Sequence, residues 1–399
     1  MRIGVPLEIA PGETRVALVP ETVGRLVKAG FEVVVESRAG ERAGHVDATY
    51  QAAGATIAAG TRELYAAVTG VLKVREPVNH PSLNVHEAEL FPEGSLLIGL
   101  LAPARNPDVI DTLAKRRISA FSMELVPRIS RAQGMDALSS MSTVAGYKAA
   151  LMAAASLGKF FPLLMTAAGT IAPARVFVLG AGVAGLQAIA TSRRLGAVVE
   201  AFDVRPAVRE EVQSLGATFV QLDLTGEAMV GAGGYAKELS ADHVQRERGL
   251  IHKHVKASDV VITTAMVPGR KAPVLITEAM VKDMRRGAVI VDMAAETGGN
   301  CELTEAGTTV SKHGVTIFGP VNLAALMPEH ASQMYSRNIS TLLNLLAKKG
   351  ELALDFEDEI TKGCCITHGG RRLLDATGKP LSAGDGQPAA AAAASKVGV

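Results

Sequence analysis

The chain of 399 residues contains no tryptophan, and only 4% of its residues are aromatic. Few aromatic rings leave little surface on which nucleic-acid bases could stack. The 41 basic residues nearly balance the 40 acidic ones, which gives a net charge of +1 and no strong attraction for polyanions. Composition therefore predicts no nucleic-acid partner.

Cysteine is scarce as well. The three cysteines Cys301, Cys364 and Cys365 are odd in number and lack C-x-x-C spacing, which argues against a disulfide framework and a zinc site. His252 and His254 alternate, but no third ligand accompanies them. We therefore expect no metal site, and the cysteine usage fits a reducing, intracellular compartment.

A long uninterrupted apolar run is also missing. The most apolar window, 149–172, is broken by Lys159 and Pro162 and leads directly into a predicted strand. Because a membrane span needs about 20 consecutive apolar residues, this window is expected to be a buried helix and a connector. Residues 1–15 lack the apolar segment of a signal peptide. Any membrane association is therefore expected to come through a partner.

The most informative stretch is RVFVLGAGVAGLQAIATSRRLGAVVEAFD, at 175–203. Its first residues are apolar and mostly β-branched, which predicts a buried strand, and a helix-forming segment follows at 184–195. A second apolar strand is expected at 198–202. A strand, a helix and a second strand in this order are typical of the unit that binds dinucleotides.

Three glycines between the first strand and the helix have G-x-G-x-x-G spacing. Gly180 would permit the tight turn, Gly182 would leave room for a pyrophosphate, and Gly185 would let helix and strand pack closely. The helix N-terminus offers free N–H groups to the phosphates. Asp203, about 20 residues further on, would accept hydrogen bonds from the ribose of NAD and repel the 2′-phosphate of NADP. Arg205 could accommodate that phosphate, but the carboxylate favours NAD.

Predicted strands and helices alternate along most of the chain, which indicates parallel sheets covered on both faces. In the first 120 residues or so, strands are expected at 2–5, 31–36, 71–74, 96–101 and 118–123. After the glycine-rich unit they are expected at 218–222, 259–264, 288–293 and 315–318. Between the two sets, 127–139 is expected to be a loop and 142–157 a helix. The later strands would complete a six-strand doubly wound order.

The C-terminal part contains a predicted helix at 331–347 and a strand at 352–356, too little to fold alone. We expect it to return to the first domain. The predicted fold class is α/β, with two Rossmann-like doubly wound parallel-sheet domains, the first discontinuous. The expected parts are a domain without a nucleotide fingerprint at 1–140 plus 325–380, an NAD(H)-binding domain at 141–324, and a flexible tail at 381–399.

Six segments give the sequence a specific likeness that runs to about residue 370. They are PGETRVALVP, MELVPRISRAQGMDALSS, TAAGTIAPARVFVLGAGVAGLQAIATSRRLGA, GAGGYAKEL, ITTAMVPGRKAPVLIT and DMAAETGGNCELT. In these segments the chain resembles the NAD(H)-binding component of the proton-translocating NAD(P) transhydrogenases, the alpha subunit domain I. It also resembles alanine dehydrogenase, a relative in the same superfamily.

The resemblance implies an Arg-Gln-Asp loop over the nicotinamide of NAD(H), formed here by Arg128, Gln133 and Asp136, with Ser139 following. Asp136 and Ser139 would fix the carboxamide, and Arg128 suits a phosphate or carboxamide oxygen. Gln133 could bridge toward the second nucleotide. From the loop alone, Asp136 could simply cap the next helix.

The resemblance also implies a mobile loop that closes over the nucleotide, here the segment with Gly234 and Tyr235. Thr264 ends a predicted strand, and therefore lies at the carboxyl edge where cofactors bind. The remaining predicted cofactor contacts are Val183 and Val204.

The two relatives differ in the proton chemistry that they need. Alanine dehydrogenase uses a histidine in the segment that reads LLIGLLAPAR here, where this chain has Leu100 or Leu101, and an aspartate that corresponds to Glu296. Arg15 and Lys73 match its substrate-holding positions, and we expect them to be ion-paired surface or cleft groups inherited with the framework. Transfer of a hydride between two nicotinamides needs no such acid or base, only two rings held together without water. The missing histidine therefore favours a transhydrogenase.

The predicted function is the NAD(H)-binding component of a proton-translocating NAD(P)⁺ transhydrogenase, with direct hydride transfer between NADH and NADP⁺ held on a partner domain. The expected partners are a second copy of the chain in a homodimer, the NADP(H)-binding domain of a beta subunit, and membrane-spanning subunits. The expected location is the cytoplasm, peripherally at the inner (plasma) membrane. The alternatives are an alanine dehydrogenase-like amino-acid dehydrogenase and a nucleotide-sensing module without chemistry.

Overall fold

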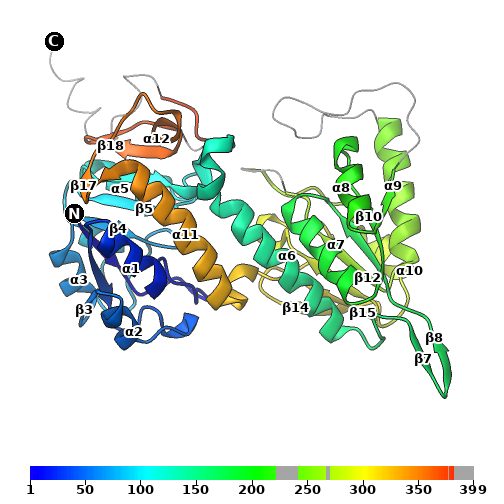
Figure 1. The fold of residues 1–399 in the computed structure, drawn as a ribbon. Coiled ribbons are helices and arrows are strands. Elements are labelled where there is room, and N and C mark those ends of the chain that lie inside the picture. Colours follow the sequence, from blue (N-terminus) through cyan, green and yellow to red (C-terminus); the bar gives the residue numbers. More distant parts are fainter. Residues whose placement is uncertain (222–240, 267–269, 376, 382–399) are drawn as a thin grey trace, which may run out of the picture. The chain divides into compact units, whose positions relative to one another are not determined.

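The computed structural model describes residues 1–221, 241–266, 270–375 and 377–381. The chain divides into two compact units. Unit 1 holds Met1–Met141 and the chain from Ala325 onward, and unit 2 holds Ser142–Ala324. The chain passes between them within helix α6 (Ala137–Ser156) and within the 3₁₀ turn at Leu323–Leu326. Each unit is a Rossmann-like α/β domain, and unit 1 is discontinuous in sequence (Figure 1).

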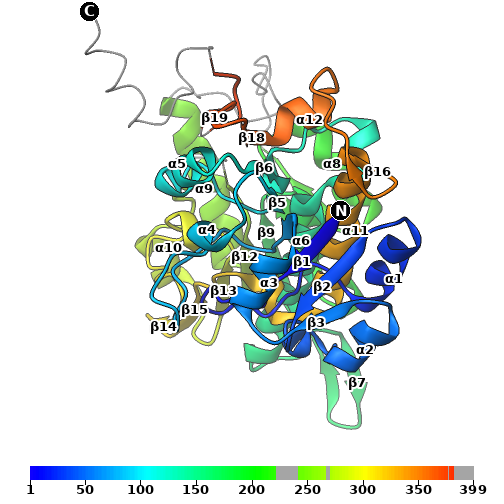
Figure 2. The same cartoon turned by 90° about the vertical axis from the view of Figure 1, so that its left-hand side faces the viewer.

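Unit 1 is built on an eight-stranded sheet with the order β19-β18-β6-β5-β4-β1-β2-β3. Its strands are β1 (Arg2–Val5), β2 (Glu32–Glu36), β3 (Thr56–Ala58), β4 (Gly70–Leu72), β5 (Leu96–Gly99), β6 (Ser119–Ser122), β18 (Cys365–His368) and β19 (Arg371–Arg372). The strands from β1 to β6 pair in parallel, and β18 adds to β6 in the antiparallel sense. Figure 2 shows β1, β2 and β3 side by side in this sheet.

Helices cover this sheet because apolar residues line one side of each. They are α1 (Pro20–Lys28), α2 (Asp47–Ala52), α3 (Thr61–Ala67), α4 (Glu87–Leu90), α5 (Pro107–Lys115), α11 (Pro328–Leu346) and α12 (Glu359–Cys364). Helix α11 comes from the C-terminal part, and its buried Ser332 and Ser336 hydroxyls accept hydrogen bonds from the backbone N–H groups of Val16 and Val19, at 3.0 and 3.1 Å. These bonds tie the returning chain to the first residues of unit 1.

Unit 2 has a seven-stranded sheet with the order β11-β10-β9-β12-β13-β15-β14. Its strands are β9 (Arg175–Leu179), β10 (Val198–Phe202), β11 (Thr218–Val220), β12 (Val260–Thr263), β13 (Val289–Asp292), β14 (Thr309–Lys312) and β15 (Val315–Phe318). All pairs are parallel except β14–β15 at the edge. The helices of the unit are α7 (Val183–Arg194), α8 (Arg209–Ser214), α9 (Ala241–Lys256) and α10 (Glu278–Asp283), with the C-terminal part of α6.

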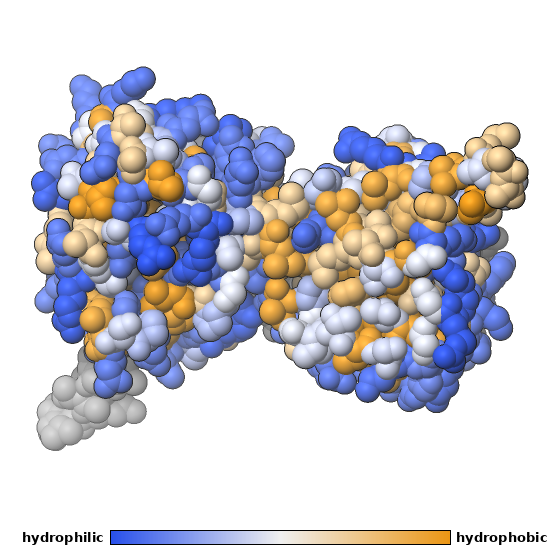
Figure 3. Space-filling model, turned by 90° about the horizontal axis from the view of Figure 1, so that it is seen from below, coloured by the Kyte–Doolittle hydropathy of each residue, from blue (hydrophilic) through white to orange (hydrophobic). Residues whose placement is uncertain are grey.

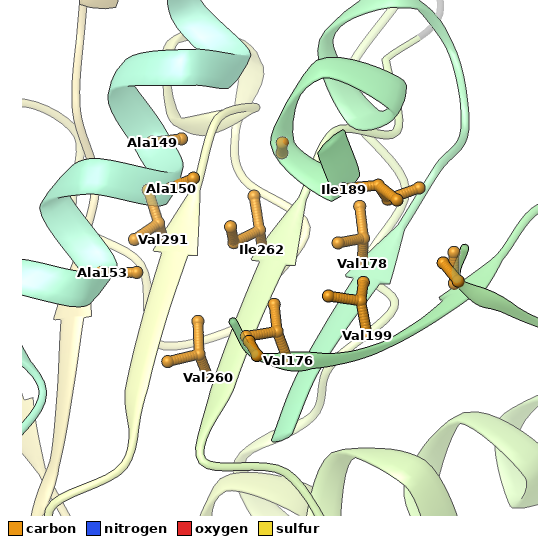
Figure 4. Close-up of a cluster of buried hydrophobic side chains, with 14 of the residues drawn as sticks. Ala149, Ala150, Ala153, Val176, Val178, Ile189, Val199, Val260, Ile262 and Val291 are labelled. Carbon is orange, nitrogen blue, oxygen red and sulfur yellow. The ribbon is translucent and has the colours of Figure 1, made fainter. Parts of the chain in front are cut away.

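The core of unit 2 places small residues of α6 over the branched residues of the sheet. Ala149, Ala150 and Ala153 face the valines and isoleucines of β9, β12 and β13 (Figure 4). Small side chains let the helix approach the sheet closely, which raises packing density without strain. A Cβ added to Gly146 would lie 2.1 Å from the carbonyl oxygen of Ala184, so α6 also passes α7 at backbone contact.

Some predicted elements differ in extent from those observed. Helix α6 begins at Ala137 and not at residue 142, because Asp136 caps it inside the segment predicted to be a loop. The predicted mobile loop with Gly234 and Tyr235 lies within residues 222–240, outside the described residues, and the chain is helical from Ala241 onward. The strand expected at 352–356 is only the short pair β16 (Ala347–Lys348) and β17 (Glu351–Leu352).

Other elements were not predicted at all. The edge strands β3, β14 and β19 are partly exposed, so they lack the continuous apolar signal of a buried strand. The segment between α6 and β9 contains a hairpin of β7 (Leu164–Thr166) and β8 (Gly169–Ile171), which projects from unit 2 (Figure 1). Its residues are mostly exposed, so no burial pattern marks it in the sequence.

Candidate nucleotide-binding site

The glycine-rich turn of unit 2 follows β9 and leads into α7. Gly180 has a φ of +98°, and a Cβ there would lie 2.4 Å from the hydroxyl oxygen of Thr264. A Cβ at Gly185 would lie 1.9 Å from the carbonyl oxygen of Gly180. A Cβ at Gly182 would meet no heavy atom within 4 Å. The fold itself therefore requires glycine at 180 and 185, whereas Gly182 faces open space of the kind that a pyrophosphate needs.

Thr264 lies directly after β12, beside this turn. Its hydroxyl donates to the carbonyl oxygens of Leu179 and Gly180, at 3.3 and 3.2 Å. The side chain thereby joins the ends of β9 and β12 at the carboxyl edge of the sheet. Parallel α/β sheets bind their ligands at this edge, next to the point where the strand order reverses.

Asp203 lies one residue after β10, and its carboxylate is buried. It accepts a hydrogen bond from the backbone N–H of Ala181, in the glycine-rich turn, at 2.7 Å. It also accepts three hydrogen bonds of 2.9 Å from Arg205, one from the backbone N–H and two from the guanidinium. The carboxylate thus lies next to the turn, as a ribose-binding acid must, and Arg205 lies in contact with it.

The two predicted valine contacts flank these groups. Val183 is the first residue of α7, and 43% of it is exposed although it is apolar. Val204 is half-buried and packs against the apolar cluster that includes Phe177 and Val261. Gly234 and Tyr235 lie outside the described residues.

A hydrogen-bond network that was not predicted from the sequence connects the loops at the same edge of the sheet. Asp292 ends β13 and is fully buried, and its carboxylate accepts five hydrogen bonds. The donors are the hydroxyls of Thr263 and Thr304 and the backbone N–H groups of Ala294, Asn300 and Cys301. An acid at the carboxyl end of a predicted strand was a signal that could have identified Asp292.

Asn300, whose backbone N–H donates to Asp292, forms side-chain hydrogen bonds to the backbone of Ala265, the residue after Thr264. Its amide nitrogen donates to the carbonyl oxygen of Ala265 at 2.8 Å, and its amide oxygen accepts from the N–H of Ala265 at 3.0 Å. A further bond of 2.8 Å reaches the carbonyl oxygen of Pro273. A lone asparagine gives no sequence signal for such a role, because its partners come from other loops.

In unit 1 the predicted nicotinamide loop is a short 3₁₀ helix, Ser130–Met135, fixed on α11. The carbonyl oxygen of Gly134 accepts a hydrogen bond of 2.9 Å from the Asn338 side chain. Arg128 and Gln133 are exposed, and neither side chain has a hydrogen bond or ion pair with any residue that the structure describes. The loop therefore presents two polar side chains from a fixed backbone.

Asp136 and Ser139 interact with each other. The Asp136 carboxylate accepts from the Ser139 backbone N–H at 2.8 Å and from its hydroxyl at 2.5 Å, which caps α6. The capping role that the loop sequence allowed is thus observed. The binding of a carboxamide by this pair stays a prediction.

Arg15 and Lys73 are ion-paired, but the expectation of a surface or cleft location was wrong for both. The Arg15 guanidinium contacts the Glu13 carboxylate at 2.6 and 2.7 Å, in the interior. The Lys73 ammonium is fully buried between Glu87, at 2.8 Å, and Glu8, at 3.3 Å. The partners of Lys73 come from other segments of unit 1, so the sequence alone did not indicate its burial. The partner of Arg15 is only two residues away, but a local ion pair does not by itself indicate burial.

One ammonium group cannot fully neutralise two buried carboxylates. Burial raises the pKa of Glu8 from 4.5 to about 7, against the attraction of Lys73. Burial also disfavours the Lys73 ammonium, but the two carboxylates outweigh it and raise the pKa of Lys73. Glu87 accepts further bonds from the Tyr65 hydroxyl and the Val78 N–H, both at 3.0 Å, whereas Glu8 accepts a backbone bond from the Val74 N–H. The group is an internal structural cluster.

Two positions correspond to the histidine and the aspartate of alanine dehydrogenase. In this chain they are occupied by leucine, at 100 or 101, and by Glu296. Leu101 is fully buried, Leu100 is partly buried, and the Leu101 backbone N–H donates to the Glu124 carboxylate at 3.2 Å. Glu296 accepts a hydrogen bond of 2.6 Å from the Asn322 backbone. A leucine cannot carry a proton, so the first of these positions offers no acid or base.

Metal sites and membrane-spanning helices can be examined only in the residues that the structure describes. There, no group of three or more His, Cys, Asp or Glu side chains is arranged to hold a metal ion. His252 contacts Asp283 and His254 contacts Glu200, both at 2.9 Å, so the two histidines face different carboxylates. No helix in this part of the chain combines the length and the apolar character that a bilayer crossing requires.

Comparison with known proteins gives matches along nearly the whole chain. A family model described as alanine dehydrogenase/PNT, N-terminal domain, matches residues 4–145, and its C-terminal counterpart matches 149–374. The first part of the NAD(P) transhydrogenase alpha subunit of Rhodospirillum rubrum is 46% identical over 375 residues, which cover 93% of this chain and 97% of that protein. Alanine dehydrogenase 2 of Staphylococcus aureus is 32% identical over 358 residues and covers 88% of each chain.

Solved structures agree with these matches. The structure of a transhydrogenase from Sinorhizobium meliloti superposes with a TM-score of 0.82 at 41% identity, covering 93% of this chain and 99% of that one. The resemblance inferred from the sequence is thereby confirmed, with higher identity to the transhydrogenase alpha subunit than to the alanine dehydrogenase. The chain belongs to the alanine dehydrogenase/PNT family.

Proposed function

We propose that this chain is the NAD(H)-binding component of a proton-translocating NAD(P)⁺ transhydrogenase, and that it exchanges a hydride directly with NADP(H) held on a partner domain. The observation that carries the proposal is the glycine-rich turn of unit 2, where Gly182 faces open space and Asp203 lies within hydrogen-bonding distance of the turn. The high identity to proteins named as transhydrogenase alpha subunits supports the same function.

In this proposal unit 2 holds the dinucleotide. The N–H groups at the start of α7 receive the pyrophosphate beside Gly182, and Asp203 accepts the ribose hydroxyls. Val183, Val204 and Thr264 line the same edge of the sheet. When bound, the cofactor supplies or accepts the hydride at its nicotinamide ring, so the chain itself needs to orient that ring and to keep water out.

The loop of unit 1 has a complementary role. Asp136 and Ser139 fix the carboxamide and thereby the ring face, while Arg128 and Gln133 reach the nucleotide or its reaction partner. The two side chains have no partner among the described residues of unit 1, which supports a role in contacts outside the unit. Gly234 and Tyr235 belong to the predicted closing loop.

The proposed partners are a second copy of this chain, the NADP(H)-binding domain of a beta subunit, and membrane-spanning subunits that place the complex at the cytoplasmic side of the inner (plasma) membrane. The hairpin β7–β8 supports the homodimer. Met165 on it is 79% exposed, and Leu163 and Phe160 just before it are 53% and 55% exposed. Figure 3 shows apolar colours where this hairpin projects, at the far right. Exposed apolar side chains on a projecting element are typical of an interface between copies.

The test mixes the purified chain with the NADP-binding component of a transhydrogenase and follows reduction of thio-NADP⁺ by NADH. We expect exchange only when both proteins are present, and binding of NADH to this chain alone. Rapid exchange by the chain alone would contradict the division of labour between two proteins.

Alanine dehydrogenase activity is the competing enzymatic function, since a relative of that name shares 32% of the residues. It would appear as oxidation of NADH by this chain in the presence of pyruvate and ammonia. Leucine at positions 100 and 101 is expected to prevent it, because no imidazole is present there to move a proton. A nucleotide sensor without chemistry would bind NADH and show neither reaction.

A further inference from the structure

The Asp203 carboxylate is already engaged by four hydrogen-bond donors. A carboxylate offers about four lone-pair positions to in-plane donors. Four donors fill them here, namely the backbone N–H groups of Ala181 and Arg205 and the Nε and Nη2 groups of Arg205. A ribose hydroxyl that donates to Asp203 therefore competes with these four donors.

The Arg205 side chain is the donor that can withdraw. The two backbone N–H groups are fixed by the glycine-rich turn and by the chain just after β10. The guanidinium stands on a flexible stem, and 33% of the Arg205 side chain is exposed, compared with 7% for Asp203. The same guanidinium is the group that could bind a 2′-phosphate, because its forked donors match phosphate oxygens.

We propose that Arg205 is a specificity-determining residue that Asp203 keeps engaged. Unit 2 already contains the cation that a 2′-phosphate requires, and the internal ion pair withholds it. Discrimination against NADP(H) then has two parts, repulsion of the phosphate by Asp203 and sequestration of Arg205. This inference rests on the proposed binding of NAD(H) in unit 2 and specifies how that site selects its nucleotide.

A double-mutant cycle separates the two parts. Wild type, Asp203→Ser, Arg205→Ala and the double variant are each titrated with NADH and with NADPH. Binding is read from the fluorescence of the reduced nicotinamide, since the chain has no tryptophan to interfere. Arg175→Ala is the matched control, because Arg175 is an exposed, ion-paired arginine at the start of β9, the opposite end of that strand from Gly180.

Sequestration predicts that Arg205→Ala changes NADPH affinity less than about threefold in wild type, but lowers it about tenfold or more in the Asp203→Ser background. Equal NADPH affinity in Asp203→Ser and in the double variant would overturn the proposal, because repulsion alone would then explain selectivity. If Arg205→Ala lowered NADPH affinity equally in wild type and in Asp203→Ser, the proposal would also be overturned, because Arg205 would then be available to bind the 2′-phosphate in wild type.

A failure of the proposed function gives a different result, since wild type would not bind NADH at all. Asp203→Asn serves as the second variant if Asp203→Ser does not fold. The asparagine keeps an acceptor oxygen and the shape of the side chain while it removes the charge that holds Arg205. NADPH affinity is then compared between Asp203→Asn and the double variant Asp203→Asn, Arg205→Ala, with the same criteria for and against the proposal.

Discussion

The Tyr335 hydroxyl donates a hydrogen bond of 2.8 Å to the backbone carbonyl oxygen of Lys73. Both residues are fully buried, and they are 262 positions apart in the sequence. The bond therefore joins the returning helix α11 to the segment after β4. Burial also raises the pKa of Tyr335 well above its usual value, so this hydroxyl stays a donor at all moderate pH values.

Tyr335→Phe is expected to lower the free energy of unfolding by about 1–3 kcal/mol, because it leaves a buried carbonyl oxygen without its donor. Denaturant unfolding of the two proteins measures the difference. Tyr147→Phe is the control, since Tyr147 is 36% exposed and its change should be within about 0.5 kcal/mol. An equal effect of both variants would show that the bond to Lys73 contributes nothing.

Gly182→Ala and Gly185→Ala should separate the binding of nucleotide from the stability of the turn. A Cβ at 185 meets the Gly180 carbonyl oxygen at 1.9 Å, so this variant should unfold more easily, by about 1–3 kcal/mol. A Cβ at 182 meets nothing within 4 Å, so that variant should keep its stability and bind NADH at least about tenfold more weakly. If Gly182→Ala bound NADH with unchanged affinity, the proposal that the pyrophosphate binds at this turn would be contradicted.

Glu8 should make the stability of the protein depend on pH. Its pKa is about 7 in the folded protein and 4.5 in a reference peptide, so the folded state holds more protons between these values. The free energy of unfolding therefore falls as pH rises from 4.5 to 7, and Glu8 contributes its full stabilisation only below this window. The groups that face it are Lys73, Glu87 and Glu13.

Glu8→Gln should flatten that pH dependence. The difference in unfolding free energy between wild type and Glu8→Gln is expected to fall by at most about 3 kcal/mol across the window, as measured by urea unfolding at a series of pH values. Glu93→Gln, at an exposed position, is the control and should leave the wild-type profile unchanged. Parallel profiles for wild type and Glu8→Gln would mean that Glu8 does not titrate there.

Gln133→Ala tests the loop of unit 1. The Gln133 side chain is exposed and makes no hydrogen bond to a described residue, so the variant should keep the stability of wild type. Hydride exchange with the NADP-binding component should fall about tenfold or more, because the two rings lose an orienting contact, while the Kd for NADH changes less than about threefold. Arg131→Ala, on the same turn but paired with Asp358 at 2.6 Å, is the control. A parallel loss of NADH affinity would make Gln133 a binding group instead.

Much of the fold could be predicted because its parallel strands are buried on both faces and therefore apolar throughout. Strand β9 and helix α7 are an example, since the apolar run, the glycines and the helix follow one another in the sequence. Strand β18 was missed because CITH mixes polar and apolar residues and its partner β6 belongs to a distant part of the sequence. Local pattern carries no information about such a distant partner.

The candidate site divides in the same way. Asp203 was predicted because its distance from the glycines is fixed by one β-α-β unit. The engagement of Asp203 by Arg205, and the burial of Lys73, depend on which side chains the fold brings together. Asn300 gave no signal, because its role consists of bonds to the backbone of Ala265 and Pro273.

The network of Asp292 and Asn300 has a consequence for the affinity of the proposed nucleotide site in unit 2. Ala265 is already fixed by bonds within the protein, so under the proposed function a nucleotide that arrives at Thr264 would not have to order this residue. Affinity there would depend on the contacts that the ligand gains and not on entropy lost by Ala265. Under the proposed function, the backbone that Asn300 holds would also keep its shape in each cycle of oxidation and reduction, whichever form of the nicotinamide is bound.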